Sequence, residues 1–164
     1  MTKSTPFIEL AQLCQSVEAT SKRTEKTELI SSFLRKISID EVQPTALFLA
    51  GRAFPESDPR VLEVSYATIS EVGKNLGQKR LMDHPLTILE VFRTLGRIAE
   101  TSGSRSRDKK TSLLQTLFTQ ASTVEAEYLV RMMLGEMRIG AVEGVLLDAI
   151  SSASRVNKEL IRRA

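Results

Sequence analysis

The residues from Arg131 to Asp148 contain a glycine-bracketed turn with a cation, followed by the start of a helix, which suits an anion. Gly135 and Gly140 flank the stretch Glu-Met-Arg-Ile at 136–139, so the backbone can turn tightly there between two apolar helices. The second helix then begins with unpaired N–H groups beside Arg138. Because free amides and the positive end of a helix dipole both favour an anion, this bend predicts a phosphate-binding site.

Two further turns place hydroxyl groups and cations close together. Residues 20–24 read Thr-Ser-Lys-Arg-Thr, and residues 101–110 read Thr-Ser-Gly-Ser-Arg-Ser-Arg-Asp-Lys-Lys, with four cations and one anion. Arginine and lysine neutralise phosphates, and hydroxyl and backbone donors fix their position, so such turns can hold a nucleic-acid backbone without reading its bases. Any one such turn is ordinarily a solvated surface turn. Three of them at helix junctions favour DNA as the partner.

The composition narrows the class of protein. The chain has 164 residues, enough for one domain with a sizeable core, and its low aromatic content of 5% favours helices over a sandwich or barrel. The net charge of +3 is too small to indicate nucleic-acid binding by itself. Cys14 is the single cysteine, so no disulfide can form within the chain, and we interpret it as a buried apolar residue. No apolar run is long enough to suggest a membrane-spanning helix.

Hydrophobic periodicity and capping signals predict an all-α fold. The predicted helices run from Pro6 to Val17 with Thr5 as N-cap, from Thr24 to Ile37, from about Asp40 to Gly51, from Asp58-Pro59 through Val72, from Thr87 through Ile98, and from Ser122 through Met133. Thr87 with Glu90, and Ser122 with Glu125, form capping-box pairs. Residues 73–84 are polar and contain glycine, which makes them the best loop candidate. We therefore predict a compact helical domain of about seven to nine helices.

The chain also repeats itself. Lys26 and the threonine after it align with Lys110 and its threonine at an offset of 84 residues (26 to 110), and the same offset carries Gly51 onto Gly135. Upstream the offset is 81, because residue 7 falls on residue 88. Amphipathic helices align by chance, but the Lys-Thr pair and the shared spacing to the glycine favour a true repeat. We infer two copies of a helical unit with pseudo-two-fold symmetry, which suits the local two-fold symmetry of a duplex backbone.

Several consecutive segments resemble one known family. The stretch LGEMRIGAVEGVLLDAI is similar to a signature near the end of the N-terminal DNA-binding domain of ATP-dependent DNA ligases of the archaeal and eukaryotic type. The stretches PLTILEVFRTLGRIAETSG, RDKKTSLLQTLF and VEAEYLVRMMLGEMRIG resemble consecutive blocks of that domain in the same order, and the opening FIELAQLCQSVEATSKRTEKTELISSFLRKI is similar to its first two helices. The resemblance covers nearly the whole chain and is strongest from Pro85 onward.

The resemblance implies a fold, a partner and a set of contacts. The family's domain is all-helical with internal pseudo-symmetry, and it contacts the DNA minor groove on both sides of a nick. Its contact positions, with the polar residues of the same turns, correspond here to Ser21, Lys22, Arg23, Ser102, Gly103, Ser104, Arg105, Lys109, Lys110, Gly135, Arg138, Gly140 and Val142. Glu136 stands where a basic residue is common, so we expect no phosphate contact from it. The implied partners are nicked double-stranded DNA, the ligase catalytic core and a sliding clamp; we expect a monomer with no membrane partner.

The residues that would seal a nick are not found in this chain. In the family, ATP adenylylates a lysine within a Lys-x-Asp-Gly motif, and no lysine here begins such a motif. The single histidine, His84, precedes a proline in a predicted loop, so we expect no histidine-dependent triad. We expect no catalytic residue, metal site or cofactor in this chain, since ATP and Mg²⁺ would bind to the catalytic core.

We further expect the chain to be an N-terminal portion of such a ligase. Its final residues form a basic tail that contains Arg155, Lys158, Arg162 and Arg163. The implied compartment is the nucleoid-containing cytoplasm of a prokaryote or the nucleus of a eukaryote.

Two other classes of protein are compatible with parts of the pattern. A helical repeat adaptor would present an exposed apolar groove to a partner helix. A free-standing enzyme has the least support, because no coherent catalytic constellation is present. The DNA-binding hypothesis requires the three glycine- and cation-bearing bends to lie on one side of a helical body.

Overall fold

Eight α-helices are formed by the residues that the computed structural model describes, which are 4–74, 85–141 and 143–154. The helices are α1 (Phe7–Glu18), α2 (Arg23–Lys36), α3 (Ile39–Leu49), α4 (Tyr66–Lys74), α5 (Ile88–Glu100), α6 (Ser106–Gln120), α7 (Thr123–Met133) and α8 (Glu143–Ser154). The predicted all-α class and helix number are confirmed. None of these helices is both long and apolar enough to cross a bilayer.

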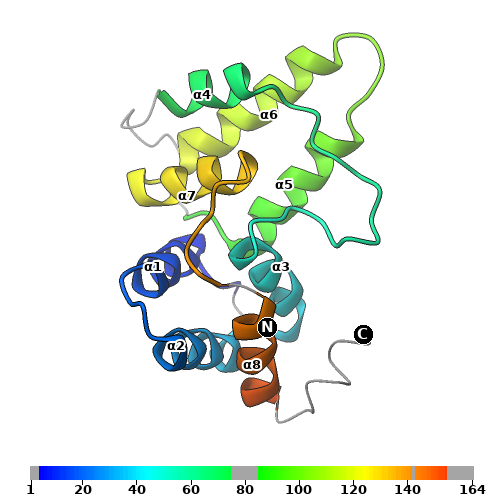
Figure 1. Cartoon of the computed structure of the whole chain (residues 1–164). Coiled ribbons are helices and arrows are strands. Elements are labelled where there is room, and N and C mark those ends of the chain that lie inside the picture. Colours follow the sequence, from blue (N-terminus) through cyan, green and yellow to red (C-terminus); the bar gives the residue numbers. More distant parts are fainter. Residues whose placement is uncertain (1–3, 75–84, 142, 155–164) are drawn as a thin grey trace.

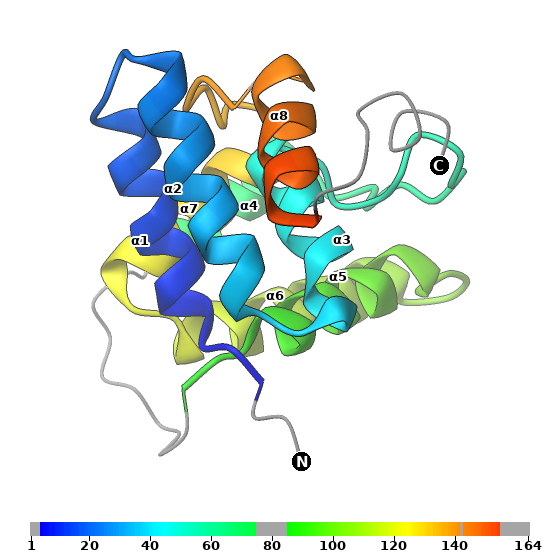
Figure 2. The same ribbon diagram turned by 90° about the horizontal axis from the view of Figure 1, so that it is seen from below.

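The helices form two similar units that exchange one helix each. One unit contains α1, α2 and α3, and the other contains α5, α6 and α7. Although α8 follows α7 in the chain, it packs on α2, and α4, which follows α3, packs on α6. In Figure 1 each helix lies across the centre of the molecule from its counterpart: α1 from α5, α2 from α6 and α8 from α4. Figure 2 shows α2 lying between α1 and the exchanged helix α8.

The two units meet at a short antiparallel bridge. The amide of Phe7 donates to the carbonyl oxygen of Leu86 at 2.7 Å, and the amide of Ile88 donates to the carbonyl oxygen of Thr5 at 3.0 Å. At the offset of 81 residues, Phe7 corresponds to Ile88 and Thr5 to Leu86, so each bond is the symmetry counterpart of the other. The bridge therefore lies on the pseudo-two-fold axis that the repeat predicted.

Local capping explains why α5 and α7 begin where they do. The hydroxyl of Thr87 accepts from the amide of Glu90 at 3.2 Å, and that of Ser122 accepts from the amide of Glu125 at 3.3 Å. In both helices the glutamate returns a bond to the capping residue's own amide, so both predicted capping boxes are confirmed. The predicted burial of Cys14 is also confirmed, and this burial raises the pKa of its thiol to about 12.

The N-terminal segment is anchored differently from the prediction. Pro6, rather than Thr5, is the N-cap of α1. The amide and hydroxyl of Thr5 instead donate to the fully buried carboxylate of Glu41, at 2.8 and 2.9 Å. Burial raises the pKa of Glu41, but hydrogen bonds from Ser38 and Thr5 outweigh it, so the pKa lies below its ordinary value. Glu41 therefore ties the chain start to the first turn of α3.

The predicted start of the fourth helix at Asp58-Pro59 is wrong. Residues 58–65, named here the extended segment, form neither helix nor strand, and Glu63 among them has a left-handed φ of 49°; α4 begins only at Tyr66. Within it, Leu62 and Val64 pack against the core while the residues beside them are exposed. Among the described residues this segment pairs with no other, so these two side chains are what attaches it to the core.

The predicted turn at residues 101–110 is shorter than expected. Helix α6 starts at Ser106, and Arg105 is its N-cap, with a left-handed φ of 62°. Gly73 and Lys74 belong to α4 rather than to the predicted loop. Val142, His84 with the rest of that loop, and the basic residues from Arg155 onward lie outside the described residues.

Candidate nucleic-acid interface

The α7–α8 bend, Gly135–Ala141, alternates between buried and exposed residues. Met137 and Ile139 are 4% and 2% exposed and anchor the bend in the core, while Arg138 and Gly140 are exposed. Gly135, Arg138 and Gly140 all have positive φ, of 71°, 41° and 80°. Among the described residues, none accepts a hydrogen bond from the amides of Arg138 or Gly140. A strained, well-anchored bend with open amides and an exposed cation can bind an anion.

Arg131 holds the α7–α8 bend from inside the molecule. Its guanidinium donates to the carbonyl oxygens of Glu136, at 3.3 Å, and Met137. It also forms a two-pronged ion pair with Glu18 at the end of α1, with N–O distances of 2.9 and 3.0 Å. The hydrogen bonds from Arg131 and from the hydroxyl of Tyr128 lower the pKa of Glu18. These contacts fix the bend to the end of α1.

Lys26 holds the same bend from α2. Its ammonium donates to the carbonyl oxygen of Ile139 at 2.7 Å and to that of Val17 at 3.0 Å. A Cβ atom added at Gly140 would lie 2.5 Å from the Lys26 Nζ, so a side chain here would require this ammonium to move from its present position. Gly140 also has a positive φ, which favours glycine.

The α1–α2 turn lies beside the α7–α8 bend. Arg23 forms an ion pair with Asp148 of α8 at 2.8 Å, and its guanidinium covers the backbone of Gly144. Ser21 and Lys22 are exposed on the same turn, with the Lys22 Nζ 3.6 Å from a carboxylate oxygen of Glu25. We name this meeting of Ser21–Lys26 with Arg138–Ala141 and Gly144 the α2–α8 junction.

The α5–α6 turn presents small residues and cations to solvent. Ser102, Gly103, Ser104 and Arg105 are all exposed, as is Lys109 on the first turn of α6. Gly103 has a φ of 86°, and a Cβ there would meet nothing within 4 Å. The turn is therefore open enough for a close approach by another molecule.

The structure places Lys110 differently from the other predicted contacts. It is only 6% exposed, and its ammonium donates to the carbonyl oxygen of Leu62 at 2.8 Å, with a carboxylate oxygen of Glu63 3.9 Å away. Its charge is therefore directed at the extended segment rather than at solvent, unlike that of Lys109.

Polar residues that the sequence analysis did not select lie beside this lysine. A cavity of about 360 Å³ separates the start of α4 from the start of α6. The hydroxyls of Ser65 and Thr68 lie 2.9 Å apart on one side, and Arg107 and Thr111 line the other. We name this meeting of Glu63–Thr68 with Ser106–Thr111 the α4–α6 junction. Repeat symmetry is the signal that could have found it, because α4 and α6 correspond to α8 and α2.

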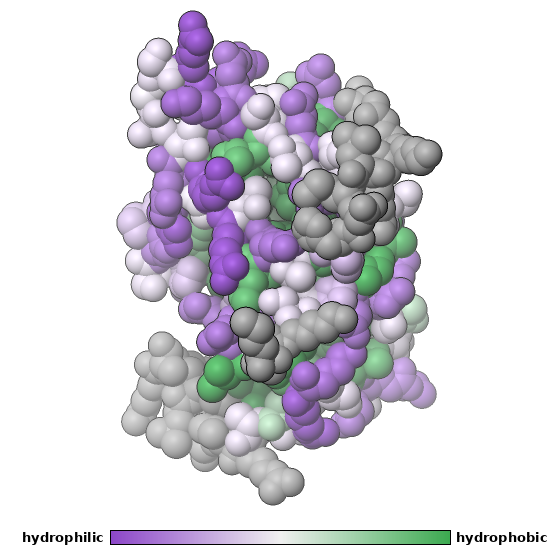
Figure 3. All heavy atoms as spheres, turned by 180° about the vertical axis from the view of Figure 1, so that it is seen from behind, coloured by the Kyte–Doolittle hydropathy of each residue, from purple (hydrophilic) through white to green (hydrophobic). Residues whose placement is uncertain are grey.

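The three predicted bends do not form one continuous patch. The α1–α2 turn and the α7–α8 bend meet at the α2–α8 junction, whereas the α5–α6 turn belongs to the α4–α6 junction. Figure 1 places the α2 and α8 helices at one end of the molecule and α4 and α6 at the other. Seen from behind, hydrophilic side chains gather on the side where the α5–α6 turn lies, with smaller hydrophobic patches among them (Figure 3).

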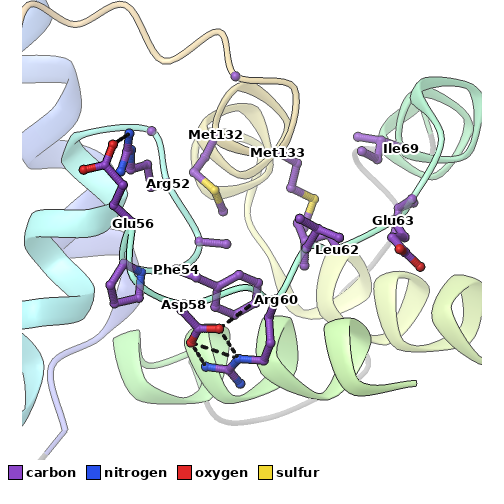
Figure 4. A pocket seen from close by; sticks show the side chains of 16 residues that line it. Arg52, Phe54, Glu56, Asp58, Arg60, Leu62, Glu63, Ile69, Met132 and Met133 are labelled. Atoms are coloured by element: carbon purple, nitrogen blue, oxygen red, sulfur yellow. Dashed lines mark hydrogen bonds and ion pairs between the residues drawn. The ribbon is translucent and has the colours of Figure 1, made fainter. Parts of the chain in front are cut away.

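An open pocket of about 470 Å³ lies between the extended segment and the end of α7 (Figure 4). Arg60 closes one side, stacked 4.5 Å above the ring of Phe54 and paired with Asp58 at 2.8 Å. Met132 and Met133 line the opposite side. Arg60 also reaches Glu100 of α5 at 3.2 Å, so these side chains fasten the extended segment to the second unit.

The described residues contain no group of three or more histidine, cysteine or carboxylate side chains placed to hold a metal ion.

Comparison with known proteins identifies the family. The sequence model described as "DNA ligase N terminus" matches residues 6–80 and 66–151, which together span nearly all the described helices. The chain belongs to this DNA ligase N-terminal family. It is 35% identical to DNA ligase 1 of Korarchaeum cryptofilum over 95% of the chain, and 33% identical to a DNA ligase of Thermococcus onnurineus over 96%. A DNA ligase of Archaeoglobus fulgidus is 32% identical over 96% of the chain.

The chain spans about a third of the length of these DNA ligases, 33% to 34% in each. The two matched ranges of the family follow the two structural units: the first contains α1 to α4, and the second begins at Tyr66 and contains α4 to α7 and most of α8. The resemblance to ligases is thus confirmed along both copies of the repeat.

Proposed function

We propose that this chain binds duplex DNA through the sugar–phosphate backbone, as the DNA-binding part of an ATP-dependent DNA ligase. The observation that carries the proposal is the repetition of one arrangement at two places. Each junction combines the start of two helices with exposed cations on an adjacent turn. Lys22, Arg23 and Arg138 are the cations of the α2–α8 junction; Arg105, Arg107 and Lys109 are those of the α4–α6 junction.

The chemistry of the two junctions suits phosphates better than bases. Helix N-termini, serine and threonine hydroxyls and flexible cations all recognise phosphate oxygens, and they give no sequence information. The two strands of a duplex are related locally by two-fold axes. A body with two equivalent cationic junctions can therefore contact both strands in the same manner, one junction on each.

A nick is the form of duplex that such a body is expected to favour. If one junction binds on each side of a point in the duplex, both can bind fully when the DNA bends or opens its minor groove between them. Deforming an intact duplex costs several kcal/mol. A break in one strand reduces this cost, so the nicked duplex binds more tightly for the same contacts.

The remaining ligase functions are assigned to other parts of a full-length ligase. ATP, Mg²⁺ and the adenylylated lysine would belong to its catalytic core, which with a sliding clamp is the protein partner that we propose. The compartment would be that of the cell's DNA. A repeat adaptor is disfavoured, because the large hydrophobic side chains exposed among the described residues, Ile39, Val61 and Tyr66, do not form a groove along one helix face.

Fluorescence anisotropy with labelled duplexes tests the proposal. Two unrelated sequences, each intact and nicked, are titrated with the protein between about 50 and 200 mM salt. With about six phosphate contacts, the logarithm of the binding constant should fall with the logarithm of salt at a slope near −5. The two sequences should bind within about threefold of each other, because phosphate contacts do not distinguish bases.

Two variants calibrate this measurement. Arg138→Ala should weaken binding to every duplex and reduce the slope by about 0.9. Lys36→Ala is the matched control. This exposed lysine is the last residue of α2, away from the α2–α8 junction, and pairs with Glu9 of α1, so its removal should leave the slope unchanged. Strong preference for one sequence, or binding that ignores salt, would contradict the proposal.

A further inference from the structure

Lys26 and Lys110 occupy equivalent positions in the two units, and each is bonded to backbone from outside its own helix. Lys26 lies on the first turn of α2 and donates to the carbonyl oxygen of Ile139. Lys110 lies at the corresponding place in α6 and donates to the carbonyl oxygen of Leu62. Both acceptors belong to segments that lead into an exchanged helix.

Each lysine therefore fixes the segment just before the exchanged helix that packs on the lysine's own helix. Ile139 precedes α8, which packs on α2, and Leu62 precedes α4, which packs on α6. The two segments differ in length and sequence, yet both present a carbonyl oxygen to the equivalent ammonium, at 2.7 and 2.8 Å. The same contact is thus present in both units although the segments differ.

We infer that Lys26 and Lys110 are positioning residues, which hold the two junctions in the conformation that grips the DNA backbone without contacting phosphates themselves. The inference rests on the proposed function. Lys110 is 6% exposed and its ammonium is bonded to the carbonyl oxygen of Leu62, so little of it is open to a phosphate. Its neighbour Lys109 is exposed and remains available for phosphate contact.

The space around Lys26 supports the same role. Its ammonium bonds to two carbonyl oxygens, one at the end of α1 and one in the α7–α8 bend. The backbone of Gly140 lies against it, so that a Cβ atom there would displace the ammonium from its present position. A buried or half-buried ammonium requires such acceptors, and its removal leaves the carbonyl groups without a donor.

Hydrogen exchange without DNA tests the positioning role independently of the proposed function. Lys26→Met should raise the exchange of the hydrogen-bonded amides at residues 147–151 of α8 by about tenfold, and Lys110→Met should do so at residues 69–73 of α4, because each exchanged helix loses the charged hydrogen bond that fixes the segment before it. Lys109→Met is the control and should leave both segments unchanged. Unchanged exchange in the named segments, or an equal rise in every helix, would overturn the inference.

DNA binding then separates positioning from direct contact. Lys26→Met and Lys110→Met should weaken binding by about tenfold with an unchanged salt slope, since no phosphate contact disappears. Lys109→Met should reduce the slope by about 0.9. A reduced slope in Lys110→Met would identify a phosphate contact and overturn the inference. If the unmodified protein fails to bind DNA at all, the proposed function fails while the exchange result still decides the positioning role.

A second pair of variants tests Lys26 without removing any charge. Gly140→Ala places a Cβ against the Lys26 ammonium, whereas Gly135→Ala has the same backbone strain and open space around it. Gly140→Ala should raise exchange in residues 147–151 of α8 more than Gly135→Ala does, with the salt slope of both unchanged. Equal effects of the two variants on amide exchange would show that Lys26 does not position this bend.

Discussion

Gly51 and Gly135 end α3 and α7 with the same hydrogen bonds, 84 residues apart (51 to 135). At each site the glycine amide donates to the carbonyl oxygen three residues back, at 2.9 and 3.1 Å, and the next amide donates five residues back, at 2.8 and 2.7 Å. Both glycines have positive φ, of 78° and 71°. This is the glycine-terminated helix end that stops a helix and reverses the chain. The repeat is therefore preserved in backbone geometry as well as in sequence.

The surroundings of these two glycines predict unequal effects of alanine. Both substitutions force alanine into a left-handed conformation, which costs about 1 kcal/mol. At Gly51 the new Cβ would also lie 3.2 Å from the Cβ of Met137, while at Gly135 it would meet nothing. Gly51→Ala should therefore lower the free energy of unfolding more than Gly135→Ala, as measured by urea denaturation. Equal losses would show that the contact with Met137 relaxes freely.

Arg138 predicts a conflict between stability and binding. Its φ of 41° strains a residue that carries a side chain. Arg138→Gly should raise the free energy of unfolding by up to about 1 kcal/mol, and the melting temperature by about 2–4 °C. The same variant should bind DNA more weakly, because it loses a cation from the α2–α8 junction. If Arg138→Gly is less stable than the unmodified protein and binds DNA with unchanged affinity, both expectations are contradicted.

Local signals allowed much of the fold to be predicted. The capping boxes at Thr87 and Ser122 lie within single helix ends, so the sequence contains the whole interaction. The extended segment before α4 was misread for a physical reason. Val61, Leu62 and Val64 supply apolar residues that suit a helix, but only Leu62 and Val64 face the core, whereas Val61 is 58% exposed.

The candidate site could be predicted only as a set of turns. Their charge and glycine content is visible in the sequence, and Arg138 and Lys109 are exposed as expected. Partners far along the chain were not visible. The acceptor of Lys110 is 48 residues away, and that of Lys26 is 113 residues away. Sequence alone gives each lysine the same charge, and only the fold separates a solvent-facing cation from one bonded to backbone.

Glu18 predicts a loss of stability in acid. Its pKa in the folded protein lies below the ordinary value of 4.5, chiefly through the hydrogen bonds from Arg131. A carboxylate with a lowered pKa contributes stability that is complete above its unfolded pKa and is lost as the pH falls through the folded pKa. Glu18→Gln should therefore be less stable than the unmodified protein at pH 7, and the difference should shrink as the pH falls below about 4.5.

Urea unfolding at several pH values measures this difference. Arg131→Met provides the matched background, because it removes the main partner of Glu18. In that background Glu18→Gln should change the free energy of unfolding at pH 7 by much less. An equal effect in both backgrounds would show that the ion pair is not the source of the pH dependence.

Cys14 provides a probe of unfolding. Its thiol is fully buried and its pKa is raised to about 12, so almost none is present as the reactive thiolate at pH 8. A thiol reagent should label the protein only as fast as it unfolds, and labelling should become complete in denaturant. Rapid labelling under native conditions would mean that α1 opens without global unfolding.

The central claim is that two equivalent junctions hold one duplex, and hydroxyl-radical footprinting of a nicked duplex tests it most directly. The account predicts two protected stretches, one on each side of the nick. Arg138→Ala should remove one stretch and Lys109→Ala the other. A single protected stretch, or the loss of both stretches in either variant, would contradict the account.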